Sequence, residues 1–215
     1  MDLHPSLSTS LVELSIEPVE GGFIDLTLYP NEVTMRLCYR LVQSGRVILH
    51  GSNSSMPYAR LEPKSANDAL KASGNQTAVF ATDNVGVALM QAVLDRDFIQ
   101  SLFASFVIGY RIVEGIPLLK VTDNIYQLFV QEDRRLCSDG YVYVLDNARF
   151  NSISASAAEY VSLSPVDPWY VLKVSAELRL WLLSVGNPRR PDTVFPYSTE
   201  EQSRLALHTS RLLHD

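Results

Sequence analysis

Apolar and polar residues follow one another in short blocks through the middle of the chain, and such blocks bounded by turn residues are typical of β-strands. They predict strands over residues 46–49, 78–82, 140–146, 159–163 and 169–174. Shorter apolar runs beside glycines predict further strands within 21–30, 109–115 and 116–121. The chain shows no internal repeat of 20 to 50 residues.

Helical periodicity, with apolar residues three and four positions apart, marks other segments. It predicts helices over 31–45, 83–103, 122–133 and about 175–185, and a last helix opened by Ser198 with Glu201 in capping-box register. Strands dominate the middle of the chain and helices lie toward both ends. This order favours an α+β fold over a regular βαβ repeat.

Composition limits the classes of protein that fit. The 215 residues are 47% hydrophobic and 20% charged, which is enough for a hydrophobic core. We expect a single domain over 1–215, with a core at about 46–175 and helical extensions at both ends. A formal net charge of −6 argues against non-specific binding to a nucleic-acid backbone.

Metal-binding, secretion and membrane signals are weak. Two cysteines and four histidines form no CxxC or HxxxH pattern, so we expect no metal and a reduced pair of thiols. The N-terminus has no basic stretch followed by an apolar block, and the most apolar stretch, 98–110, is too short to span a bilayer. A cytoplasmic protein without membrane contact is therefore expected.

Three motifs occur in a set order along the predicted strands. They are "HGS" at 50–52, "VFAT" at 79–82 before a helix that contains Ala88, and "EYVSLSPVDPWYVLKV" at 159–174. In this order they resemble the catalytic domain of poly(ADP-ribose) polymerase-like, diphtheria-toxin-type ADP-ribosyltransferases. The resemblance implies a split, mainly antiparallel β core with flanking helices, and NAD as a substrate whose ADP-ribose passes to an unknown protein or nucleic-acid acceptor, or to water.

The resemblance also assigns roles to individual residues. Gly51 would offer its backbone donor and acceptor to the nicotinamide carboxamide, because a glycine has no Cβ to obstruct the ligand. Ser52 would add a hydroxyl to the same amide, and His50 would hydrogen-bond a ribose hydroxyl. Glu159 matches the catalytic glutamate, whose charge stabilises the oxocarbenium-like state formed as nicotinamide leaves.

Other parts of the expected NAD site depart from the family pattern. Phe80 matches the Phe-Ala strand, but Val79, Val87, Leu89 and Met90 occupy positions where the family has tyrosine and serine. Tyr58 or Tyr110 would then supply the stacking face for nicotinamide. Arg60 would face the pyrophosphate, because a guanidinium provides a fork of donors. The polar loop from 53 to 77 is expected to border this site and to be more mobile than the strands.

Simpler interpretations of the same residues remain open. His50 also fits a core histidine satisfied by a backbone carbonyl, Glu159 a surface carboxylate, and Arg60 a solvated charge. Two alternative functions accompany them. One is an RNA 2′-phosphotransferase-like enzyme, in which Arg46 and Arg60 hold phosphate, and the other is a non-catalytic nucleotide- or partner-binding module on the same fold.

Overall fold

The computed structural model describes residues 22–65, 76–103, 106–114, 116–154, 158–183 and 194–198, together with 11, 13, 14, 16 and 200. The strands are β1 (Phe23–Asp25), β2 (Val47–Ser52), β3 (Lys64–Ser65), β4 (Thr77–Thr82), β5 (Ile108–Val113), β6 (Ile116–Val121), β7 (Gly140–Asp146), β8 (Asn151–Ser154), β9 (Glu159–Ser162), β10 (Tyr170–Val174) and β11 (Val194–Pro196). The α-helices are α2 (Asn31–Gln43), α3 (Val85–Val93), α4 (Arg96–Leu102), α5 (Asp123–Val130) and α6 (Arg179–Leu182).

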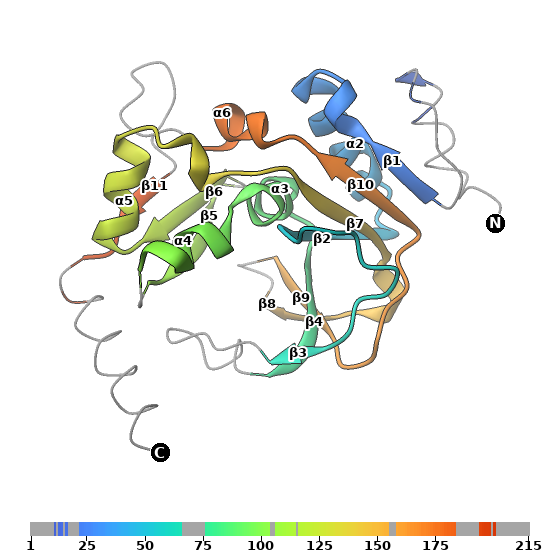
Figure 1. Ribbon diagram of the computed structural model, residues 1–215. Coiled ribbons are helices and arrows are strands. Elements are labelled where there is room, and N and C mark those ends of the chain that lie inside the picture. The colour runs from blue at the N-terminus through green and yellow to red at the C-terminus, as the bar shows by residue number, and fades with distance from the viewer. Residues whose placement is uncertain are drawn as a thin grey trace.

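Two sheets with helices around them give the expected α+β class (Figure 1). The larger sheet has the order β1-β10-β7-β2-β4-β9-β8, with β3 on β4, and the smaller one has the order β11-β6-β5. Neighbouring strands are antiparallel except for the pairs β1–β10 and β11–β6. Because β1 and β11 join the sheets, strands outside residues 46–175 take part in both of them. The extent of the domain stays a prediction.

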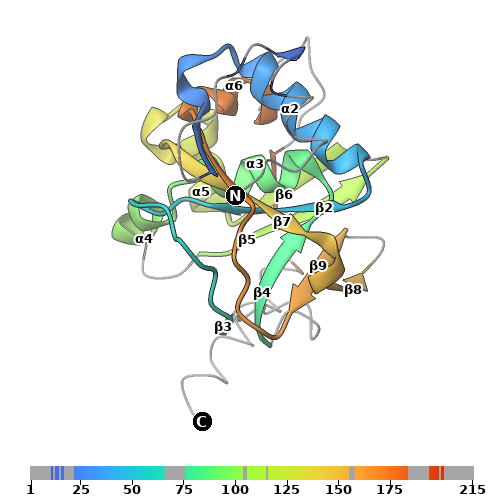
Figure 2. The ribbon, with the colours of Figure 1, turned by 90° about the vertical axis from the view of Figure 1, so that its right-hand side faces the viewer.

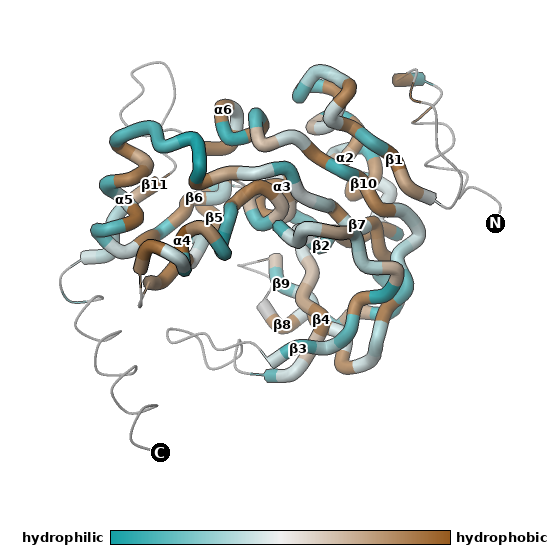
Figure 3. Tube along the Cα trace, viewed as in Figure 1, coloured by the Kyte–Doolittle hydropathy of each residue, from teal (hydrophilic) through white to brown (hydrophobic). Residues whose placement is uncertain are grey.

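Helix α3 lies against β2 and β7 near the middle of the molecule (Figure 1). It is apolar on nearly all sides, as its mainly brown colour shows (Figure 3), and eight of its nine residues are buried. Two strand glycines allow its close approach. A Cβ on Gly51 would lie 2.9 Å from the backbone nitrogen of Ala92, and a Cβ on Gly140 would lie 2.7 Å from the carbonyl carbon of Ala92. Both distances are shorter than real Cβ contacts, so the helix can rest here only on glycine.

The larger sheet buries a separate apolar cluster on each face. Alternate residues of β2 divide between them, because successive side chains of a strand point to opposite faces. Val47 and Leu49 belong to the cluster around α3, whereas Ile48 belongs to the cluster that includes Tyr143 and Ala81. Figure 2 shows β4 and β9 turning steeply away from the line of β2 and β7, so that the second cluster lies in the angle between them.

Several element predictions are confirmed and several need correction. The strands predicted at 78–82, 140–146, 159–163 and 169–174 and the helix at 31–45 are present within a residue or two, and the helix predicted at 122–133 is present but ends three residues early, at Val130. The helix predicted over 83–103 is instead two helices. Leu94 leaves the helix to form a β-bridge with Cys137, and the Asp95 carboxylate accepts the Phe98 N–H at 2.8 Å to start α4.

The segment predicted as a helix near 175–185 is a 3-10 turn, Ala176–Leu178, followed by the single turn α6. Strands β3, β8 and β11 were not predicted, because their polar or proline-containing sequences resemble loops, and the partner of β11 is also distant in sequence. The predicted C-terminal helix from Ser198 lies almost wholly outside the described residues. So does the stretch 66–75 of the polar loop, and the expected mobility of that loop stays a prediction.

Candidate functional site

Strand β2 does not end at Leu49, as the sequence suggested, but continues through the whole HGS motif. Residues Val47–Ser52 pair with β7 in unbroken register, and His50 lies opposite Tyr143. Pairing with β4 on the other edge is limited to one pair, Leu49 with Thr82. Beyond this pair the two strands separate, and we refer to the gap between His50–Ser52 and β4 as the split.

The Gly51 peptide faces the split. The Asn147 N–H donates to the Arg46 carbonyl at 2.9 Å, which makes these two residues a hydrogen-bonded pair at the start of the β2–β7 ladder. Hydrogen-bonded and non-hydrogen-bonded pairs alternate along an antiparallel ladder. The peptide groups of Leu49 and Gly51 therefore point away from β7, toward β4. The Leu49 peptide groups lie opposite Thr82 on β4, whereas the Gly51 peptide groups lie beyond the last residue pair of the β2–β4 ladder.

The His50 ring spans part of the split. Its Nδ1 lies 2.6 Å from the backbone oxygen of Phe80 on β4. A carbonyl oxygen only accepts, so Nδ1 carries the proton in this bond. Burial lowers the pKa of His50, this hydrogen bond opposes the shift, and the charge of Lys64 adds to it. The ring is therefore neutral near pH 7, and Nε2 is left with a lone pair that accepts a hydrogen bond.

Glu159 opens β9 and is held in register with the split. It pairs with Thr82, which in turn pairs with Leu49. Neighbouring strands lie about 4.8 Å apart, so the Leu49 and Glu159 backbones are separated by roughly 10 Å. The Tyr110 hydroxyl of β5 donates to a Glu159 carboxylate oxygen at 3.2 Å. The smaller sheet therefore contributes a side chain, Tyr110, to the candidate site formed by β2, β4 and β9.

His50 and Glu159 approach the split from opposite faces of the sheet. Directly paired residues share a face, so Glu159 lies on the face of Thr82 and Leu49, and His50, next to Leu49, points to the other. Phe80 is two residues from Thr82 and shares its face. A ligand that contacts both His50 and Glu159 must enter the gap between β2 and β4.

The reason for a glycine at position 51 differs from the one expected. The sequence suggested that a side chain there would obstruct a ligand. The Cβ direction of Gly51 instead points at α3, where an added Cβ would overlap the Ala88 carbonyl and lie 2.9 Å from the Ala92 nitrogen. The missing side chain serves helix packing, and the backbone edge is a separate feature that faces the split.

Three further side chains, Tyr143, Tyr58 and Lys64, follow His50 in a series that leads from the split to the surface. The rings of His50 and Tyr143 have centroids 5.8 Å apart, and Tyr58 stacks on Tyr143 with centroids 6.2 Å apart and planes inclined by 21°. The Tyr58 N–H donates to the Tyr143 hydroxyl at 3.0 Å. Lys64 places its ammonium 4.9 Å from the centre of the Tyr58 ring. Tyr143 and Lys64 were not singled out from the sequence, where they look like an ordinary strand residue and an ordinary loop charge.

Arg60 and Ser52 lie outside this series of four side chains. Arg60 is exposed, and its Nε lies 3.4 Å from a carboxylate oxygen of Asp167 and 3.8 Å from one of Glu62. The β-bridge between Leu61 and Val166 keeps the neighbouring residues Arg60 and Asp167 close together. Ser52 is half-buried at the end of β2, opposite Tyr141 on β7. Arg60 therefore faces two carboxylates, and Ser52 stays beside the Gly51 peptide.

The departures from the family pattern in the second motif are explained by burial. Val79, Val87, Leu89 and Met90 are at most 3% exposed, and all of them except Val87 belong to the two apolar clusters. None of these positions can present a ring to a ligand. The aromatic residues beside the candidate site residues are instead Tyr110, which contacts Glu159, and Tyr58, which is 39% exposed.

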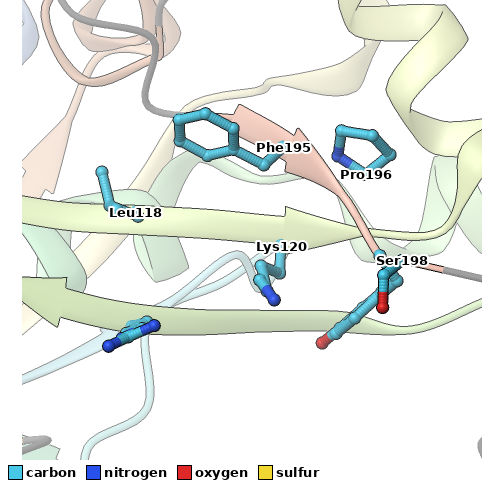
Figure 4. Close-up of a pocket in the computed structure, with 7 residues that line it drawn as sticks. Leu118, Lys120, Phe195, Pro196 and Ser198 are labelled. Atoms are coloured by element: carbon cyan, nitrogen blue, oxygen red, sulfur yellow. The ribbon is translucent and has the colours of Figure 1, made fainter. Parts of the chain in front are cut away.

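A pocket of about 380 Å³ lies elsewhere, on the smaller sheet (Figure 4). Its lining comes from β5, β6 and the segment around β11, and comprises Arg111, Leu118, Lys120, Phe195, Pro196, Tyr197 and Ser198. Along β5, Arg111 alternates with Tyr110, so this pocket opens on the face opposite to the one that carries Tyr110. It is separate from the split, and no motif in the sequence had indicated it.

Comparison with known proteins adds no relative. No protein-family model, curated protein or solved structure matches the chain. Within the described residues, no helix is both long and apolar enough to cross a membrane, and no three His, Cys, Asp or Glu side chains are grouped as metal ligands would be.

Proposed function

We propose that the protein is an NAD-dependent ADP-ribosyltransferase whose NAD site is the split, on a fold of the ADP-ribosyltransferase type. One observation carries the proposal. The β2–β4 ladder ends after a single pair, which leaves the Gly51 peptide and the His50 ring on one side of a gap and Glu159 near its other side. A continuous sheet would have closed this gap with backbone hydrogen bonds.

The groups at the split match the nicotinamide end of NAD. A carboxamide has one donor side and one acceptor side, and the Gly51 N–H and C=O offer the complement along an unpaired strand edge. The Ser52 hydroxyl lies next along the strand and adds a further partner. A neutral His50 with a free lone pair on Nε2 accepts from a ribose hydroxyl. Tyr110, whose hydroxyl contacts the Glu159 carboxylate, would supply an aromatic ring on that side of the split.

The chemistry follows from the charge on Glu159. The bond between C1′ of the ribose and the nicotinamide nitrogen breaks, and its electron pair leaves with nicotinamide, which becomes neutral. Positive charge develops on C1′ and the ring oxygen, and a nearby carboxylate stabilises it more than it stabilises bound NAD. A nucleophile of the acceptor, or water, then bonds to C1′ and releases a proton. The acceptor is a protein, a nucleic acid or water.

The arrangement of basic residues counts against the phosphotransferase alternative. Arg46 precedes β2, at the end of the strand remote from the split, and Arg60 faces the carboxylates of Glu62 and Asp167. The two arginines are therefore not gathered around one phosphate. A non-catalytic module on this fold remains the principal competitor, because the same groups bind a nucleotide without turning it over.

The test is release of nicotinamide from NAD, followed by chromatography. We expect turnover by the wild-type protein and a loss of about 100-fold or more in Glu159→Gln, because the amide keeps the shape but removes the charge. Glu32→Gln, on the exposed first turn of α2, is the matched control and should leave the rate unchanged. Wild-type-like turnover in Glu159→Gln would contradict the transferase. NAD binding without turnover by the wild type would favour the binding module.

A further inference from the structure

Lys64 is a cation in the series of side chains that leads to His50, and it has no acidic partner among the described residues. Within the described part of the chain, no carboxylate lies within 4.0 Å of its ammonium group. The ammonium instead lies 4.9 Å from the centre of the Tyr58 ring. A cation over an aromatic face is held in place without being neutralised. The ammonium group of Lys64 is therefore available to bind an anion.

The position of Lys64 relative to His50 is set by stacked rings. Tyr58 stacks on Tyr143, and Tyr143 packs against His50, so Lys64, Tyr58, Tyr143 and His50 form one continuous series. The pairing of Lys64 with Ala78 also fixes its backbone on β4, the strand that forms the other wall of the split. The charge of Lys64 acts on the His50 ring, whose pKa it helps to lower. Lys64 is thus close enough to His50 for its charge to affect the protonation of the ring.

We propose that Lys64 binds the diphosphate of the dinucleotide and is a specificity-determining residue for NAD. The inference rests on the proposed function, in which His50 holds the nicotinamide ribose. The 5′-phosphate is only three bonds from the ribose ring, so the diphosphate must lie beside the ribose site. Lysine binds phosphate as a point charge. Tyr58, stacked between Lys64 and the buried Tyr143, orients the lysine.

This assignment replaces the one that the sequence suggested for Arg60. Arg60 is turned toward Asp167 and Glu62, and an anion placed there would meet two negative charges. The two residues are only four positions apart and both are exposed. Arg60→Gln and Lys64→Gln therefore remove the same charge from the same region, and they form a matched pair.

Calorimetry with ADP-ribose, inorganic pyrophosphate and nicotinamide tests the assignment. Lys64→Gln should weaken ADP-ribose and pyrophosphate about tenfold or more and leave nicotinamide unchanged, because only the first two ligands carry the diphosphate. Arg60→Gln should change none of the three. Equal weakening by both substitutions would mean that only the general charge of the region matters, and would overturn the role of Lys64.

Two further outcomes separate this inference from the proposed function. If NAD is consumed and Lys64→Gln has the wild-type KM, the role of Lys64 fails while the transferase stands. If ADP-ribose and pyrophosphate bind in a Lys64-dependent way but no nicotinamide is released, the transferase fails while the diphosphate site stands. An NMR titration of His50 without ligand checks the position of Lys64 in the folded protein. Lys64→Gln should raise the pKa of His50, because it removes a charge that lowers this pKa, and Arg60→Gln should leave it unchanged.

Discussion

Replacing Gly51 with alanine is expected to destabilise the protein by displacing α3, not by obstructing a ligand. The new Cβ would lie 2.9 Å from two backbone atoms, the Ala88 carbonyl carbon and the Ala92 nitrogen, where ordinary contact begins at 3.4 Å. It would overlap the Ala88 carbonyl oxygen still more. Both neighbours are helix backbone, so relief requires a shift of α3 as a whole within its apolar surroundings.

Overpacking of a core costs about 1–3 kcal/mol, and more when the obstacle cannot rotate away. We therefore expect a loss of about 3 kcal/mol for Gly51→Ala. In a chain of this length that corresponds to a decrease in Tm of about 6–12 °C. Thermal unfolding followed by circular dichroism measures it, with NAD binding measured in parallel on the folded variant.

Gly45→Ala is the control for this variant. Gly45 has a φ of +68° and nothing within 4 Å of an added Cβ, so alanine meets only backbone strain there. That strain costs about 1 kcal/mol. A Gly51→Ala variant with wild-type Tm but without NAD binding would refute the packing argument, and would restore the explanation that a side chain obstructs the ligand.

Three other predictions concern stability and reactivity. Asn53→Ala should cost about 1–2 kcal/mol in unfolding free energy, because its amide donates at 3.0 Å to the Ala92 carbonyl, and Ser55→Ala, at an exposed position, should cost much less. The free energy of unfolding should fall as pH drops below about 6.5, because the lowered pKa of His50 means that the native state binds fewer protons than the unfolded state. A His50→Gln variant should show a shallower decline, and an identical pH profile would contradict the assignment. Cys38 and Cys137 should resist iodoacetamide until the protein unfolds, because burial raises the pKa of each thiol to about 12, and mass spectrometry of the native protein would reveal any faster labelling.

Much of the fold could be predicted because the strands of the larger sheet carry local signals. Alternating β-branched and aromatic residues mark β7 and β10, and a capping residue and helical periodicity mark α3. Strands β8 and β11 carry no such signal, because pairing at a sheet edge decides their conformation, with the adjacent β9 for β8 and with the distant β6 for β11. Tertiary context outweighs local preference in such segments.

The candidate site was predictable in its residues but not in its geometry. His50 and Glu159 stood out through their motifs, whereas the split depends on where β2 and β4 stop pairing, a property of two strands and not of either sequence. The reason for the missing side chain at Gly51 was not evident from the sequence, because close approach of a ligand and close approach of a helix both require a missing Cβ. Tyr143 and Lys64 can be assigned to the candidate site only from contacts in the folded chain, where Tyr58 stacks on Tyr143 and Lys64 lies over the Tyr58 ring.

A crystal structure of the Glu159→Gln variant soaked with NAD tests the nicotinamide site most directly, because slow turnover would leave the substrate intact. The carboxamide should lie about 2.7–3.2 Å from the Gly51 N–H and C=O, with a ribose hydroxyl donating to His50 Nε2. Residue 159 should lie beside C1′. An empty split at saturating NAD, or NAD bound instead in the pocket beside Arg111 and Lys120, would contradict the proposed function.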